Sequence, residues 1–236
     1  HMNKLDRTGG PLINIFGVDH GGYVKRMNAA VEALSGRKGM LDIRLCQLVN
    51  LMDNGRPVKM SKRAGTFVTV RDVIDSVGAD VIRFIMLTRR SEQTLDFDFA
   101  RVTEQSRDNP VFYVQYAHAR ACSVLRQAGE DAAVEAAMDR LDHPAEMEVL
   151  RHLTSWPKLV ISAANAHEPH RIALFLMDLA ASFHALWTAG REAPELRFIR
   201  EDDAALSAAR LRLVKATALV IRSGLGVLAI EAREEM

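Results

Sequence analysis

Residues 59–65 read KMSKRAG and place two lysines, Lys59 and Lys62, three positions apart. Residues 55–58 (GRPV) predict a turn before this stretch, and residues 66–70 (TFVTV) predict a strand after it. Lysines on such an exposed loop can approach a triphosphate and neutralise the charge that develops as the phosphoryl centre reacts. A solvated basic turn would be the better interpretation of an arbitrary Lys-x-x-Lys. A chance match to all four residues Lys-Met-Ser-Lys, however, has a probability on the order of 10^-3 in a chain of this length.

A strand–helix–strand unit precedes the loop. Residues 12–16 are short and apolar, as in a buried parallel strand, a helix is expected over residues 23–34, and residues 41–49 predict the next strand. This order indicates a parallel sheet with a right-handed crossover. Ligands of such sheets bind at the carboxyl ends of the strands, which is where the turn of residues 17–22 (GVDHGG) lies.

The sequence after the loop changes character. Two short helices are expected within residues 70–88 and a brief alternating strand over residues 94–99, and from there the pattern is helical almost to the end. We place a domain boundary near Ala100. It divides the chain into an α/β domain of residues 3–100, with a partial Rossmann-like parallel sheet, and an all-α bundle of about four helices over residues 101–236.

The first long helix of the bundle begins at Pro110, with Asn109 as its cap. At 100° per residue its apolar face contains Val111, Val114, His118, Ala121 and Leu125. Tyr113, Tyr116 and Arg120 fall on the opposite face, where two tyrosines and an arginine can stack on bases and contact phosphate. The alternative is that the bundle buries both faces and the tyrosines are core, and the residues alone favour that alternative.

The composition limits the possible classes of protein. The net charge of +1 requires any contact with nucleic acid to come from local patches. Two isolated cysteines, Cys46 and Cys122, indicate a reducing, cytoplasmic setting, and the eight histidines show no metal-binding spacing. The apolar run of residues 172–187 contains Asp178 and His184, which favours a core helix over a membrane span.

Several stretches together resemble arginyl-tRNA synthetases, which are class I aminoacyl-tRNA synthetases with a Lys-Met-Ser-Lys-Ser loop. They are residues 16–20 (FGVDH), 58–70 (VKMSKRAGTFVTV), 108–120 (DNPVFYVQYAHAR) and the end of the chain near 224–236. The resemblance spans residues 12–236. It implies the C-terminal part of a class I Rossmann catalytic domain, followed by a helical anticodon-binding domain of the DALR type.

The resemblance also implies an activity and its residues. Members of this family join L-arginine to tRNA(Arg) with ATP, which Mg²⁺ accompanies. The implied catalytic residues are Lys59, Ser61 and Lys62; the implied ATP-binding residues are Gly17, Asp19, His20 and Met60; and the implied anticodon-binding residues are Tyr113, Gln115, Tyr116 and Arg120. No metal ligand of the protein itself is implied, and no membrane is expected.

This sequence departs from the family pattern at three points. It contains no His-x-Gly-His motif, and the strand at residues 12–16 leaves no room for a preceding βα unit. We therefore expect a segment of a longer protein that lacks half of the nucleotide site, is inactive alone and can still bind tRNA. Arg63 replaces the last serine of the lysine loop, a change that we expect to be tolerated. Gly21-Gly22 stands where relatives often carry another histidine, and ordinary turn chemistry remains an equal interpretation of Asp19 and His20.

Two other classes of function remain open at this stage. One is a different class I synthetase with a similar helical domain, such as the cysteine enzyme, although two isolated cysteines count against its zinc site. The other is a non-enzymatic RNA-binding module. The natural open reading frame would decide the second alternative, because a native chain that starts near Asn3 would exclude the enzyme.

Overall fold

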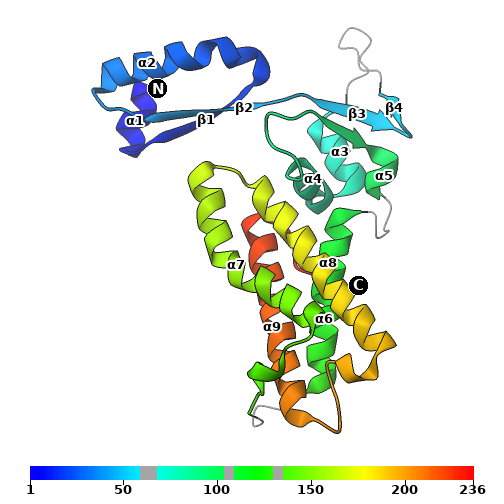
Figure 1. The fold of residues 1–236 in the computed structure, drawn as a ribbon. Helices are drawn as coiled ribbons and strands as arrows, with labels where there is room; N and C mark the ends of the chain where they lie inside the picture. Colours follow the sequence, from blue (N-terminus) through cyan, green and yellow to red (C-terminus); the bar gives the residue numbers. More distant parts are fainter. Residues whose placement is uncertain (59–67, 104–108, 130–134) are drawn as a thin grey trace. The chain divides into compact units, whose positions relative to one another are not determined.

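The structure, a computed structural model, describes residues 1–58, 68–103, 109–129 and 135–236 (Figure 1). It divides into two compact units, which we describe separately. Unit 1 contains His1–Lys59 and Arg89–Phe99, and unit 2 contains Met60–Thr88 and Ala100–Met236. The structure thus groups residues 68–88 with unit 2. The sequence-based boundary near Ala100 assigns them to the α/β domain and remains a prediction.

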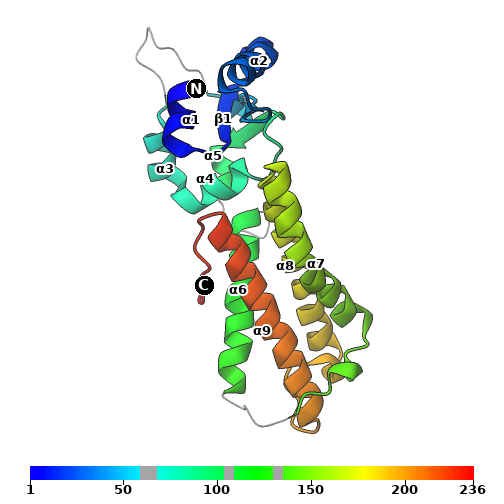
Figure 2. The same ribbon diagram turned by 90° about the vertical axis from the view of Figure 1, so that its left-hand side faces the viewer.

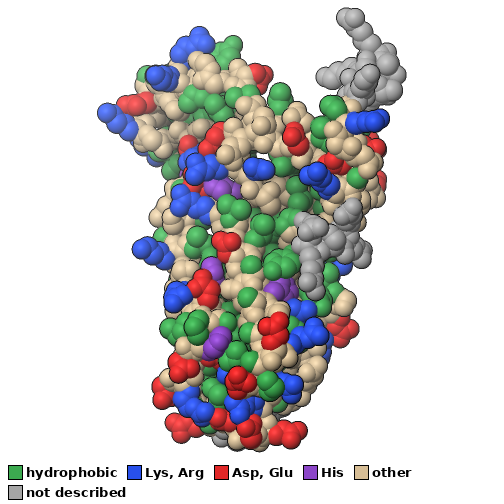
Figure 3. Space-filling view, turned by 45° about the vertical axis from the view of Figure 1, so that its right-hand side comes forward, with side chains coloured by type: hydrophobic (Ala, Val, Ile, Leu, Met, Phe, Trp, Pro, Cys, Tyr) green, Lys and Arg blue, Asp and Glu red, His purple; other side chains and the backbone are tan. Residues whose placement is uncertain are grey.

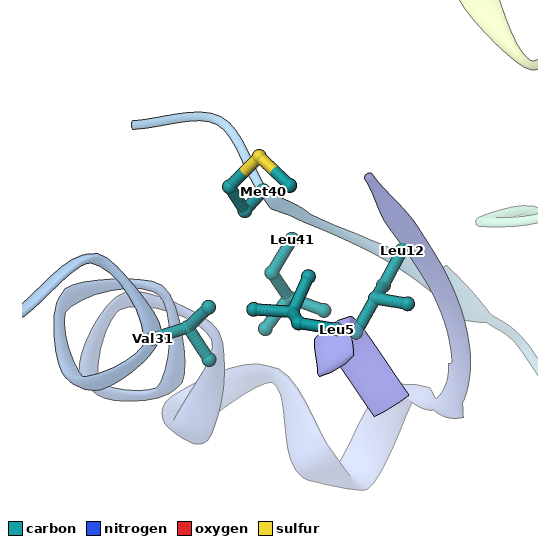
Figure 4. Packing of buried hydrophobic residues seen from close by; sticks show 5 residues of the cluster. All are labelled: Leu5, Leu12, Val31, Met40 and Leu41. Atoms are coloured by element: carbon teal, nitrogen blue, oxygen red, sulfur yellow. The ribbon is translucent and has the colours of Figure 1, made fainter. Parts of the chain in front are cut away.

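Unit 1 contains the predicted strand–helix–strand unit. Strands β1 (Leu12–Gly17) and β2 (Leu41–Cys46) are parallel, with Leu12 opposite Leu41 and Gly17 opposite Cys46. They are joined by a 3-10 helix, η1 (Val18–Tyr23), and by α2 (Val24–Ser35). A short helix, α1 (Met2–Thr8), precedes β1. The core between these elements consists of Leu5, Leu12, Val31, Met40 and Leu41 (Figure 4).

The burial of β1 differs from the prediction. Residues 12–16 were expected to be buried throughout, but only alternate side chains are. Ile13 and Ile15 are 52% and 70% exposed, whereas Leu12 and Asn14 are buried. Successive side chains of a strand point to opposite faces of the sheet, and in the described structure only one face of this pair is covered. The run of residues 12–16 therefore predicts the strand correctly but not the burial of both its faces.

A second small sheet lies at the end of unit 1. It contains β3 (Val49–Asp53), β4 (Arg56–Pro57) and β5 (Leu95–Asp98) in the order β4-β3-β5, with β3 and β5 parallel. The single strand predicted over residues 41–49 is therefore wrong, because β2 ends at Cys46. The Gln47 N–H donates to the carbonyl of Ser91 at 2.7 Å instead of continuing the β1 ladder.

Unit 2 is helical. Its elements are α3 (Val70–Val77), α4 (Ala79–Met86), α6 (Pro110–Ala128), η2 (Met138–Arg140), α7 (Pro144–Ala166), α8 (His170–Glu192), η3 (Pro194–Leu196) and α9 (Ala204–Val227); α5 (Phe99–Thr103) lies at the junction of the two units in sequence. The strand predicted over residues 66–70 is wrong in its described part. Thr69 caps α3 and forms a capping box with Asp72, which overrides the strand-like alternation of the sequence. The fold class, a small parallel sheet followed by a helical bundle, is confirmed.

The bundle packs α6, α7, α8 and α9 together, with α6 and α9 side by side (Figure 2). The helical spacing of apolar residues in α8 predicts a stripe on one face, and the members of this stripe are buried: Ile172, Phe175, Leu179, Phe183 and Leu186. This helix is the one described helix long and apolar enough to cross a membrane, and 50% of its most apolar window is buried. Such burial is typical of the core helix of a bundle.

Gly224 and Gly226 in the sequence predict the end of the last helix, but α9 continues through both to Val227. Gly224 lies against α8, where a Cβ atom at this position would be 2.7 Å from Leu176 Cδ2. A glycine inside a helix can thus mark the close approach of a neighbouring helix instead of the helix end.

A buried ion pair joins α7 to α9. Arg210 of α9 and Glu146 of α7 are 4% and 1% exposed, and Nε of the arginine donates to Oε1 of the glutamate at 2.6 Å. The guanidinium also donates to the carbonyls of Glu195 and Arg197, while Oε2 of Glu146 accepts from the N–H of His143 at the start of α7. These bonds satisfy charges that would otherwise be costly to bury.

Candidate nucleotide site and nucleic-acid interface

The candidate ATP-binding residues of unit 1 lie at the carboxyl end of β1. Gly17 is the last residue of the strand, and a Cβ atom there would be 2.5 Å from Asp19 Oδ1. The carboxylate of Asp19 therefore folds back over Gly17, into space that any other side chain would fill. Helix α2 has no side-chain cap, so Asp19 does not cap it as the turn interpretation suggested.

His20 lies in an aromatic row beside Asp19. Its ring is 5.5 Å from Phe16 and 6.0 Å from Tyr23, and its Nε2 is 3.7 Å from Asp19 Oδ2. Asp19 and His20 are both exposed at the strand end, where ligands of parallel sheets bind. The structure brings Gly17, Asp19 and His20 together. Their role toward ATP remains a prediction.

The lysine loop lies outside the described residues. Lys59, Met60, Ser61 and Lys62 are all in the stretch 59–67, so their roles remain predictions. The segments that flank the loop are described. Before the loop, the Val58 N–H donates to the carbonyl of Leu51 at 2.9 Å. After the loop, Thr69 caps α3.

The predicted RNA-binding face of α6 meets α8 in an aromatic–arginine cluster, which consists of Tyr113, Tyr116, Arg120, His184 and Trp187. The Arg120 guanidinium lies over two rings, 4.4 Å from the centroid of Tyr116 and 4.6 Å from that of Trp187. It also donates to the hydroxyl of Tyr116 at 2.8 Å. Cation–π contacts of this kind hold a guanidinium in a fixed orientation on a surface.

His184 links the members of this cluster. Its ring is 4.5 Å from that of Tyr113 and is stacked on that of Tyr116 at 5.7 Å. Arg120 Nη1 lies 2.9 Å from His184 Nδ1, and His184 Nε2 lies 3.2 Å from the carbonyl of Tyr113. Because arginine only donates and a carbonyl only accepts, these partners assign the proton to Nε2.

The exposure of the two tyrosines favours the surface alternative, and their contact with RNA remains a prediction. Tyr116 is 39% exposed and Tyr113 is partly buried, so neither belongs to the closed core. His184 and Trp187 were not predicted as part of this surface. Their spacing of three residues on one helix, away from the buried stripe of α8, was a signal that could have found them.

Gln115 does not share that surface. It is 1% exposed, and its Nε2 donates to Asp80 Oδ2 at 3.3 Å and to the carbonyl of Glu231 at 2.9 Å. Gln115 thus joins α6 to α4 and to the C-terminal tail. The predicted direct contact of Gln115 with RNA is not supported by this position, and we leave the residue out of the proposed interface.

Two more side chains, the exposed Arg83 and the buried His118, contact the same tail. Arg83 of α4 donates from Nε to the carbonyl of Leu228 at 2.9 Å. The buried His118 ring contacts the carbonyl of Arg233 through Nδ1 at 2.8 Å. The buried polar side chains of α6, Gln115 and His118, therefore hold other segments of the protein.

Among the residues that the structure describes, no three His, Cys, Asp or Glu side chains form a group that could hold a metal ion. Cys46 and Cys122 are free. Burial raises the pKa of the Cys122 thiol, which makes it a weaker nucleophile at neutral pH.

Comparison with known families identifies the class to which this bundle belongs. Residues 114–236, more than half of the chain, match the DALR anticodon binding domain, and the chain belongs to this family. This stretch contains Tyr116, Arg120, His184 and Trp187 of the cluster, and Tyr113 immediately precedes it.

More specific similarity is to arginine–tRNA ligases. The arginine–tRNA ligase of Rhodospirillum rubrum is 56% identical over 100% of this chain and 42% of its own length, and that of Ruegeria pomeroyi is 56% identical over the same shares. The solved Thermus thermophilus arginyl-tRNA synthetase has a TM-score of 0.70 and 25% identity, covering 96% of this chain and 41% of that one. The predicted resemblance is confirmed, and the chain spans less than half the length of these relatives.

Proposed function

We propose that the protein to which this chain belongs is an arginine–tRNA ligase, and that unit 2 binds the anticodon region of tRNA(Arg). The observation that carries the proposal is the aromatic–arginine cluster, a partly exposed surface on a chain of the DALR family. Aromatic rings and an oriented guanidinium are suited to unpaired bases and their phosphates. The similarity to arginine–tRNA ligases supports arginine over the cysteine enzyme.

The proposed chemistry has two steps. The carboxylate of L-arginine attacks the α-phosphorus of ATP and pyrophosphate leaves, after which the arginyl group passes to the terminal ribose of the tRNA. In the first step, positioning and charge neutralisation matter more than covalent help from the protein. Mg²⁺ would accompany the ATP phosphates. The proposed setting is the cytoplasm.

Each candidate residue has a role in this scheme. Lys59 and Lys62 would neutralise the departing phosphates, Ser61 would donate a hydrogen bond beside them, and Met60 would complete the loop against the nucleotide. In unit 1, the bare backbone of Gly17 would let the adenosine approach, and Asp19, folded over it, would accept from ribose hydroxyls. His20 would line the same strand end. These roles are proposals. The described structure contains Gly17, Asp19 and His20 but not the four loop residues.

Binding of tRNA by the 236-residue chain tests the anticodon part of the proposal. The chain should bind a tRNA(Arg) transcript more tightly than a transcript that differs only in its anticodon. Each lost or mismatched base contact should lower the affinity by about 5- to 150-fold, the equivalent of 1–3 kcal/mol for a base stacked on an aromatic side chain. Equal affinity for the two transcripts would contradict the proposal.

Exchange of pyrophosphate into ATP tests the enzymatic part. The chain alone should show no arginine-dependent exchange, because half of the nucleotide site is expected outside it. In the complete protein, Lys62→Ala should lower the activation rate by about 10^2-fold or more, the scale for loss of one group that stabilises transition-state charge. An unchanged rate would return the lysine loop to the solvated-turn interpretation.

A further inference from the structure

The four long helices of the bundle differ in their content of acidic residues. Helices α6 and α9 contain no aspartate or glutamate, whereas α7 contains Glu146 and Glu148 and α8 contains Asp178 and Glu192. Helices α6 and α9 also lie next to each other (Figure 2). The overall net charge of +1 hides this difference. On the face drawn in Figure 3, by contrast, acidic and basic side chains are intermixed over the bundle.

The cations of α9 form a narrow stripe on its outer side. At 100° per residue, Arg212, Lys215 and Arg222 fall within about 80° of one another, with the exposed Leu219 between them. All three charged residues are exposed, and the opposite side of the helix holds the buried Leu213, Thr217 and Ile221 among others. At 1.5 Å per residue, the stripe extends about 15 Å along the helix axis. We call Arg212, Lys215 and Arg222 the α9 basic stripe.

The stripe is not neutralised within the described part of the chain. None of its three side chains makes a hydrogen bond or an ion pair there, whereas many other cations of the bundle do: Arg140 pairs with Asp203, Arg200 with Asp202, and the buried Arg210 with Glu146. The nearby carboxylate of Glu235 in the C-terminal tail pairs with Arg126 of α6. Three unpaired cations on one helix face create a local positive potential, although the net charge of the chain is only +1.

We infer that the α9 basic stripe binds the phosphate backbone of an RNA stem. Double-helical nucleic acid carries a phosphate charge about every 1.7 Å of its axis, so a stripe about 15 Å long can meet several phosphates. The stripe contains no aromatic side chain, so it is unsuited to stacking on unpaired bases, which is the task proposed for the aromatic–arginine cluster. This inference rests on the proposed function and adds a second surface to it: the cluster takes the bases of the loop, and α9 takes the backbone of the stem.

The salt dependence of tRNA binding tests the inference. In the 236-residue chain, replacement of all three residues (Arg212→Ala, Lys215→Ala and Arg222→Ala) should leave the melting temperature nearly unchanged, since the side chains are exposed. The slope of log affinity against log salt should become shallower by about 2–3, and the affinity for a tRNA(Arg) transcript at 0.1 M salt should fall by about 10^2-fold. Lys215→Ala alone should change the slope, whereas Lys158→Ala, an exposed lysine of α7, should not.

Two further measurements, of binding to a single-stranded RNA and to lipid vesicles, complete the test. A single-stranded RNA heptamer with the anticodon-loop sequence should bind the triple variant as well as the wild type, and an equal loss for heptamer and tRNA would overturn the assignment to a stem. If the wild type binds tRNA and the triple variant keeps the same salt slope, the inference fails and the proposed function stands. If the wild type binds no tRNA, both fail. Loss of binding to vesicles of phosphatidylcholine and phosphatidylserine, with tRNA binding unchanged, would assign the stripe to a lipid surface and overturn the inference.

Discussion

The two units of this chain stabilise their folds in different ways. In unit 1, a two-stranded parallel sheet buries Leu12 and Leu41 on one face and leaves Ile13 and Ile15 exposed on the other. In unit 2, four long helices enclose a core with many fully buried side chains, and even its charged pair, Glu146 and Arg210, is satisfied inside. Unit 2 therefore has the features of a domain that is stable on its own, whereas unit 1 presents the candidate nucleotide-binding residues on a two-stranded sheet that is covered on one face.

The buried ion pair should give the largest effect on stability. Glu146→Ala leaves the Arg210 guanidinium buried without its carboxylate partner and removes the Glu146 half of the capping box of α7, so unit 2 should lose about 3–5 kcal/mol of unfolding free energy. Thermal or urea unfolding measures this loss. Arg151→Ala, which breaks an exposed pair on the same helix, should change the stability little. Equal losses of stability for the two substitutions would show that the buried pair does not stabilise unit 2 more than an exposed pair.

Core and exposed positions of the small sheet should differ sharply. Leu41→Ala empties part of the unit 1 core and should cost about 2–5 kcal/mol, whereas Ile15→Ala on the exposed face should cost less than about 1 kcal/mol. The free energy of unfolding of unit 1, followed by amide hydrogen exchange in β1 and β2, reports both. A large cost for Ile15→Ala would mean that this face of β1 is covered in the protein in solution.

Two glycines of α9 provide a matched pair in unit 2. Gly224→Ala pushes a Cβ atom against the buried Leu176 and should destabilise the bundle by about 1 kcal/mol net of the helix propensity gained. Gly226→Ala meets no atom within 4 Å and should stabilise the helix by about 0.5–1 kcal/mol. Changes of the same sign at both sites would show that α8 and α9 do not approach as closely as described.

The smallest effect concerns the cap of α3, which follows the lysine loop. The hydrogen bond from the Thr69 hydroxyl, followed by that from the Thr69 backbone N–H, lowers the pKa of Asp72 below its usual value. A carboxyl group whose pKa is lowered on folding adds stability above its unfolded pKa of about 3.9 and loses it as the pH falls through the folded pKa. The protection factors of the α3 amides, which correct for the intrinsic pH dependence of exchange, should therefore fall more between pH 5 and pH 3 in the wild type than in Asp72→Asn. The same fall in both proteins would contradict the capping role.

Local signals in the sequence were enough to predict most elements. Asn109-Pro110 marked the start of α6, and the apolar stripe of α8 marked its buried face, because caps and helical periodicity act within one element. The errors came from contacts between elements. Gly224 looked like a helix end because nothing in its neighbourhood predicts Leu176, and Thr69 looked like part of a strand although Asp72 was available to form a capping box.

The candidate interface shows the same limit. Tyr113, Tyr116 and Arg120 could be assigned to one face of a helix from spacing alone, but Gln115 was placed on that face by resemblance and is buried against α4 and the tail. His184 and Trp187 come from a helix more than sixty positions later, so periodicity within α6 could not supply them. Tertiary contacts decide which polar side chains hold the fold and which are presented to a ligand.

The central claim is that the aromatic–arginine cluster of unit 2 faces RNA, and Tyr116→Ala in the 236-residue chain tests it most directly. The melting temperature and the tRNA(Arg) affinity should be measured on the same sample. We predict a nearly unchanged melting temperature, because Tyr116 is partly exposed, together with a loss of about 1–3 kcal/mol in tRNA affinity, the usual size of one base-stacking contact. A loss of about 3–5 kcal/mol in stability, with wild-type affinity in the folded fraction, would instead make Tyr116 a core residue and contradict the claim.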